Sequence, residues 1–184
     1  MVRKGAVILG GGALLVACTL QTILPYGGGP QPGAASQVVG ASGGIVTAND
    51  GTMVLIPPMA LAADVTITIG LDPSPVPLVG PQVLTPAHVF GPEGQTFAVP
   101  VCVTLSFEPE LLPKGATEAN VVLYSTMLDA GGYEPLESMA ADATHVTGMT
   151  SHFSTIMAGY GSVTEVDAGA DGASCDGSII EAGE

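Results

Sequence analysis

Few residues in this sequence have the types and the spacing that chemistry requires. The three histidines, His88, His145 and His152, are scattered, and no Cys-x-x-Cys pair accompanies them, so no zinc site is predicted. Serine, histidine and aspartate residues occur without a Gly-x-Ser-x-Gly nucleophile elbow. Glu108 and Glu110, two positions apart, are more typical of a solvated loop than of an acid–base pair. We therefore expect no metal, no cofactor and no turnover enzyme.

The segment that precedes Cys18 has the composition of an export signal. Arg3 and Lys4 form a short basic start, and an apolar, glycine-rich stretch runs from Gly5 to Ala17. This stretch is shorter than the ~20 residues that a helix needs to cross a bilayer core, so we expect it to be removed. Its end, Leu15-Val16-Ala17-Cys18, resembles the lipobox of bacterial lipoproteins.

The resemblance implies cleavage before Cys18, a diacylglycerol thioether on its sulfur, and an acyl chain such as palmitate on its amine. Two or more chains anchor a protein stably, so the resemblance implies membrane attachment through the lipid on Cys18. Thr19 stands where an aspartate would resemble an inner-membrane retention signal, which favours the outer membrane of the cell envelope. The alternative is an ordinary secretory signal in which Cys18 is simply a small residue.

The other two cysteines, Cys102 and Cys175, would then lie in an oxidising compartment. They can form a disulfide that ties the C-terminal segment to the domain, or they can remain unpaired. Two cysteines alone carry no framework signal, so the sequence leaves both alternatives open.

The charge balance excludes nucleic acid as a partner. The full chain has three basic residues and 17 acidic ones, a net charge of −14; without Arg3 and Lys4, only Lys114 opposes the 17 acids, which gives −16. Binding to phosphates requires clustered Lys and Arg. A sparse acidic charge of this kind is more typical of a protein that its net charge keeps soluble.

Composition divides the chain into four parts. We predict a signal peptide at residues 1–17, the lipidated cysteine with a flexible Gly/Pro-rich spacer at 18–37, one domain at 38–160, and a disordered acidic tail at 161–184. In the tail, Asp167, Asp171 and Gly172 have offsets like those of a calcium loop, but several ligand positions lack chelating side chains.

Short alternating segments predict that the domain is all-β, an antiparallel β-sandwich. In 101–107, Val101, Val103, Leu105 and Phe107 should face the core, and Cys102 should face outward and be accessible. Asn49-Asp50-Gly51 should close a hairpin between 44–48 and 53–56, and 91–94 should close another. Further strands are predicted at 65–69, 121–126, 133–136, 145–149 and 153–157.

Three segments together resemble the ZU-five domain, a β-sandwich module found in a tight-junction protein, netrin receptors and ankyrins. They are 43–47 with 54–61, where the family usually has glycine in place of Met59; 90–101, Phe-Gly-Pro-Glu-Gly-Gln-Thr-Phe-Ala-Val-Pro-Val; and His152-Phe153-Ser154. The resemblance covers about residues 40–160 and implies the same fold as the strand pattern.

In some ZU-five domains the His-Phe-Ser triplet cleaves itself, which here would cut between Phe153 and Ser154. The serine hydroxyl would attack the preceding carbonyl, with His152 as a candidate base. On one strand, His152 and Ser154 would share a face about 6.6 Å apart, so the reaction needs a kink or another base. The preferred interpretation places Phe153 in the core, with His152 and Ser154 on an outer face.

These features predict a lipid-anchored envelope protein that acts as a binding or structural module through its sheet edges or loops, with another envelope or surface protein as partner. The first alternative is a self-cleaving module. The second alternative is a surface adhesin for carbohydrate or matrix. The aromatic content of 4%, without Trp, argues against a carbohydrate ligand, since sugars stack on aromatic rings.

Overall fold

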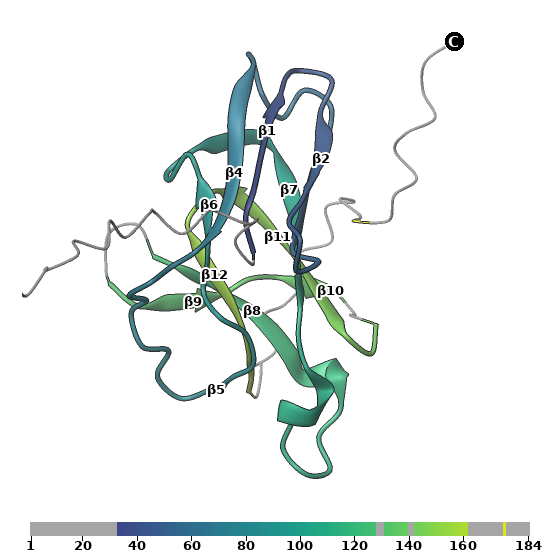
Figure 1. The fold of residues 1–184 in the computed structure, drawn as a ribbon, viewed down its shortest axis with the longest axis vertical. Helices are drawn as coiled ribbons and strands as arrows, with labels where there is room; N and C mark the ends of the chain where they lie inside the picture. The colour runs from purple at the N-terminus through teal and green to yellow at the C-terminus, as the bar shows by residue number, and fades with distance from the viewer. Residues whose placement is uncertain (1–32, 128–130, 140–141, 162–174, 176–184) are drawn as a thin grey trace, which may run out of the picture.

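The computed structural model describes residues 33–127, 131–139, 142–161 and Cys175, and these form two antiparallel sheets packed face to face (Figure 1). The predicted signal peptide, Cys18, most of the spacer and almost all of the tail, including the calcium-like loop, lie outside the described residues. The described strands are β1 (Ala35–Val39), β2 (Gly44–Thr47), β3 (Met53–Ile56), β4 (Val65–Leu71), β5 (Gln82–Val83), β6 (His88–Gly91), β7 (Thr96–Ser106), β8 (Val121–Thr126), β9 (Tyr133–Pro135), β10 (Ser138–Met139), β11 (His145–His152) and β12 (Thr155–Tyr160).

The larger sheet has the order β1-β4-β6-β12-β8-β9, and β5 adds to β12. The smaller sheet has the order β10-β11-β7-β3-β2. Two short 3₁₀ helices, η1 (Pro109–Leu111) and η2 (Glu118–Asn120), lie in the connection from β7 to β8. The architecture is the predicted all-β sandwich.

The core fills the space between the sheets, as the alternation predicts. Along β7 and just beyond it, Val101, Val103, Leu105 and Phe107 are all buried. On β4, Ile67 and Ile69 are buried as well, while the intervening Thr66 and Thr68 are exposed. One apolar face per sheet is what makes two sheets pack against each other.

The predicted hairpin at Asn49-Asp50-Gly51 is confirmed, because β2 pairs with β3 from Thr47↔Met53 to Gly44↔Ile56. Gly51 has φ of +90°, a conformation that glycine adopts without steric cost. Beyond β3, Pro57 and Pro58 cannot donate hydrogen bonds to the ladder, and the strand ends at Ile56.

Two connections differ from the prediction. Residues 91–94 do not close a hairpin, because β6 and β7 belong to different sheets; the turn carries the chain from one sheet to the other. The segment 153–157 is not one strand: β11 ends at His152 in the smaller sheet, and β12 begins at Thr155 in the larger. Phe153 and Ser154 therefore form a crossover between the sheets.

The domain also begins earlier than predicted. The spacer was expected to reach Gln37, but β1 starts at Ala35 and pairs along its whole length with β4. Ladder hydrogen bonds to β4 order these residues even though only Val39 of the strand is fully buried. Their composition, Ala-Ser-Gln-Val-Val, contains too little apolar alternation to predict a strand.

Candidate functional site

The His152-Phe153-Ser154 segment leads from the smaller sheet to the larger, and its last two residues are fully buried. Phe153 is fully buried, with ring centroids 4.7 Å from Phe97 and 5.8 Å from Phe90. The predicted core position of Phe153 is therefore confirmed. The outward position expected for Ser154 is wrong, because Ser154 is fully buried and its Oγ lies 2.6 Å from Ser125 Oγ.

Backbone hydrogen bonds to β6 and to the β6–β7 connection fix this crossover. The Phe153 N–H donates to Gln95 O (2.8 Å), the Gly94 N–H donates to Phe153 O (3.0 Å), and the Phe90 N–H donates to Ser154 O (3.1 Å). The backbone thus leaves the strand conformation where self-cleavage requires a kink. His152 Nε2 is buried and has no hydrogen-bond partner within the part of the chain that the structure describes.

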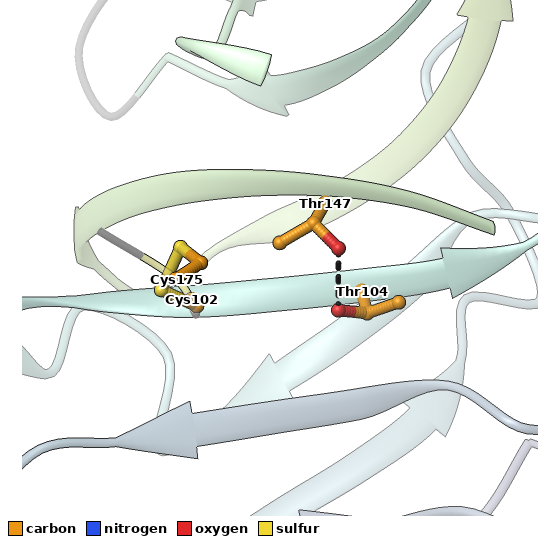
Figure 2. The surroundings of a disulfide bond; sticks show 4 residues. All are labelled: Cys102, Thr104, Thr147 and Cys175. Atoms are coloured by element: carbon orange, nitrogen blue, oxygen red, sulfur yellow. Dashed lines mark hydrogen bonds between the residues drawn. A yellow bond between two sulfur atoms is a disulfide. The ribbon is translucent and has the colours of Figure 1, made fainter. Parts of the chain in front are cut away.

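Of the two alternatives for Cys102 and Cys175, paired or unpaired, the structure contains the disulfide. Figure 2 shows Cys175 against Cys102 on β7, beside the Thr104–Thr147 pair whose hydroxyl oxygens lie 2.8 Å apart and link β7 to β11. Cys102 faces away from the core as predicted, but it is not accessible, because it is only 9% exposed. The sulfur of Cys175 covers it.

An outer groove of about 440 Å³ runs along this same face of the smaller sheet. Apolar side chains of Met53 and Leu55 and the disulfide line one part of it, and Thr104, Thr147 and His145 line another. The strand register explains the grouping, since Met53, Thr104 and Thr147 are direct neighbours across β3, β7 and β11. Sequence reasoning missed this groove because cross-strand register is not encoded in any one strand.

A polar cluster links the β2–β3 turn to β6; His88 and Thr52 in it are buried, and the Asp50 side chain is 29% exposed. His88 Nε2 lies 2.8 Å from Asp50 Oδ2 and 3.1 Å from Thr52 Oγ1, and its Nδ1 lies 3.2 Å from Pro86 O. Both ring nitrogens thus lie within hydrogen-bond distance of oxygen atoms, which fixes the orientation of the ring. Burial alone would raise the pKa of Asp50, but hydrogen bonds from His88 and Thr52 outweigh it and hold that pKa below 3.8.

The remaining candidates lie apart from these groups. Glu108 and Glu110 are exposed at η1, which agrees with a solvated loop. Within the described residues, no helix is long and apolar enough to cross a membrane. Free sheet edges are formed by β1 and β2, which contact each other (Figure 1). Val38 on β1 and Ile45 on β2 are 60% and 43% exposed.

No protein-family model and no characterised protein matches this sequence significantly. The similarity to lipoprotein signals and to ZU-five domains therefore remains a prediction from short motifs. The assignment of the fold rests on the structure alone.

Proposed function

We propose that this chain is a lipid-anchored module outside the cytoplasm, on the outer membrane, that binds another envelope protein. The observation that carries the proposal is Leu15-Val16-Ala17-Cys18 at the end of an apolar stretch with a basic start. The Cys102–Cys175 disulfide supports an exported location, because disulfides persist in oxidising compartments and are rare in the cytosol.

The adjacent edges of β1 and β2 are the surface best suited to a partner. Neither strand contains a charged residue, a proline or a bulge, the devices with which proteins usually blunt sheet edges. Val38 and Ile45 place exposed apolar side chains there. An extended segment of the partner can add a strand to such an edge, so that main-chain hydrogen bonds supply affinity and apolar side chains supply selectivity.

The anchor is tested by metabolic labelling with radioactive palmitate in cells that express the full chain. We expect label in the wild type, no label in Cys18→Ser, and loss of that variant from the membrane fraction. A Cys102→Ser/Cys175→Ser double variant is the matched control and should keep the label. Membrane association of Cys18→Ser without label would overturn the anchoring proposal.

The binding surface is tested by capture of cross-linked partners from detergent-solubilised membranes. Val38→Lys and Ile45→Lys should each reduce recovery of the wild-type partner, since a lysine blunts an edge strand. Val79→Lys is the matched control, because Val79 is 89% exposed in the loop between β4 and β5 and belongs to neither edge strand. Equal recovery with all three variants would exclude the edges as the contact surface.

Self-cleavage between Phe153 and Ser154 is the second candidate function. The crossover geometry suits this reaction better than one continuous strand through both residues would. Ser154 Oγ would attack the Phe153 carbonyl carbon, the amide bond would give way to an ester, and water would then release the two fragments. The Gly94 N–H already donates to the Phe153 oxygen, where negative charge would develop. Intact-mass measurement decides: a fragment beginning at Ser154, absent from Ser154→Ala, supports cleavage, and a single uncut chain excludes it.

A further inference from the structure

The connection from β4 to β6, which Figure 1 shows as a long loop leading through β5, presents an apolar segment to solvent. Proline alternates with other residues in Pro73-Ser74-Pro75-Val76-Pro77, and all five residues are exposed. Val76 is 50% exposed, and Val79, just beyond, is 89% exposed. Exposed apolar side chains that gather in one segment are typical of a contact surface.

The loop is held to the larger sheet at its base and at one side chain. At the base, the Asp72 N–H donates to Ala87 O at 2.9 Å. Leu78 is half-buried and packs on the apolar cluster that β8 and β12 form on their outer face. Gly159 leaves room for it, because a methyl group there would lie 3.1 Å from Leu78 Cδ2 and 3.1 Å from Tyr124 Cε2. The prolines and valines of the loop therefore stay outside while its position on the sheet is fixed.

The prolines restrict the backbone of residues 72–77 before any partner binds. Each proline has φ near −65°, and each residue that precedes a proline is kept out of the helical region. Together these two constraints cover all six residues, which favours the extended polyproline II conformation. A segment that is already extended loses little conformational entropy when it is bound.

Polyproline II has three residues per turn, so residues three apart lie on one face. Pro73, Val76 and Val79 have this spacing, and all three are exposed. Leu78, the residue packed on the sheet, falls on another face. Gly80 has φ of +106°, which ends the extended run. The segment thus turns one apolar face away from the sandwich.

This segment is unsuited to strand addition, the mode proposed for the edges of β1 and β2. The three prolines lack the N–H groups that a strand would present on one side. On the other side, the Ser74 N–H already donates to Asp72 Oδ1 at 2.8 Å. Among the described residues, no backbone carbonyl from Pro73 to Val79 accepts a hydrogen bond. Acceptors without donors suit a partner that supplies N–H and O–H groups from its side chains.

We propose that residues 72–79 are a docking segment for a protein whose groove is lined by tryptophan and tyrosine. Aromatic rings pack against proline and valine, and the indole N–H and the phenol O–H donate to the free carbonyls. Asp72 is the charged residue of the connection 72–87, in a chain of net charge −14, so the rim of the groove is neutral or basic. This contact goes beyond the proposed role of the β1 and β2 edges and takes a different partner.

Photo-cross-linking tests the proposal with the full chain in the cells that produce it. p-Benzoylphenylalanine in place of Ser74 puts the reactive group inside the segment and leaves both valines intact. We expect a cross-link to one protein, mapped by mass spectrometry to a peptide that contains tryptophan or tyrosine. No cross-link, or a cross-link only to peptides without these residues, would overturn the proposal.

Competition by unmodified full chains then locates the contact. Val76→Lys and Val79→Lys should need at least about tenfold more protein than the wild type to suppress the cross-link, since each puts a charge on the apolar face. Replacement of the three prolines by alanine should weaken competition about 2- to 5-fold, because the segment becomes flexible. Urea midpoints of the two lysine variants should stay unchanged, since both valines are exposed.

Val38→Lys and Ile45→Lys are the matched controls and should compete like the wild type, because they alter only the edges. Equal competition by Val76→Lys and the wild type would overturn the docking segment. Loss of competition by Val38→Lys in place of Val76→Lys would assign the contact to the edges, which overturns this inference and leaves the proposed function standing.

Discussion

Met59 is, within the described residues, the non-glycine position at which φ is positive, at 63°. The left-handed conformation costs an L-residue about 1 kcal/mol because Cβ approaches the carbonyl oxygen. Packing of the side chain offsets little of this cost, since Met59 is 75% exposed. The conformation is held by the Met59 N–H, which donates to Ala41 O at 2.8 Å, and the ZU-five resemblance places a glycine here.

We therefore expect Met59→Gly to stabilise the domain by about 0.5–1 kcal/mol, the usual size of such an effect after the entropy of glycine is deducted. Urea unfolding followed by circular dichroism measures the change. Met59→Ala keeps the Cβ and is the control that should bring no gain. Equal stabilisation by both variants would show that the exposed thioether, and not the backbone conformation, was unfavourable.

At Asp50, the cost of losing the carboxylate should depend on pH. Because its pKa is lower in the folded than in the unfolded chain, the ionised group stabilises the fold above about pH 4, and this contribution disappears as pH falls through the lowered pKa. Asp50→Asn should thus cost about 1–3 kcal/mol near neutral pH, since it removes an acceptor from buried His88.

The measurement is the urea midpoint of both proteins between pH 6 and about pH 2, in which the difference between them should shrink with acidification. Asp64→Asn is the control for loss of a charge without a histidine partner. A constant difference across this range would show that the Asp50 carboxylate does not act through its ionisation.

At the scale of the elements, one side chain at the β11–β12 crossover packs against residues of both sheets. Phe153 contacts the rings of Phe90 and Phe97, which belong to strands of different sheets. Truncation of a fully buried phenylalanine typically costs about 3–5 kcal/mol. We expect Phe153→Ala to lower the free energy of unfolding by this amount, as measured in urea, and Phe153→Leu to lose much less. A cost below about 1 kcal/mol would mean that the sheets can close around the cavity.

Local pattern predicted the strands better than it predicted how they connect. The alternation in 65–69 and 101–107 identifies strands and inward faces because side chains alternate with period two. The turn at 91–94 has the composition of a hairpin, yet its flanking strands pair with β4 and β12 in one sheet and with β3 and β11 in the other. Which strands pair depends on contacts distant in sequence, and no single segment contains that information.

The same limit applies to the candidate site. Asp142 and His145 are close in sequence, and a carboxylate three residues before a histidine is a weak local signal. Ser106 becomes the cross-strand neighbour of His145 only through the β7–β11 register, nearly forty positions away.

At the scale of the whole molecule, the three cysteines have two expected states, one lipidated and two paired with each other, and counting free thiols tests the location and the fold together. If Cys18 is lipidated and Cys102 is paired with Cys175, the mature protein has no free thiol. Maleimide-polyethylene glycol added to the denatured protein should then produce no mass shift without reductant and two additions after reduction. A chain lacking residues 1–18 and retained in a reducing cytoplasm should show two additions at once. One addition to the mature protein without reductant would mean that Cys18 is free, and three after reduction would mean that its sulfur never received a lipid.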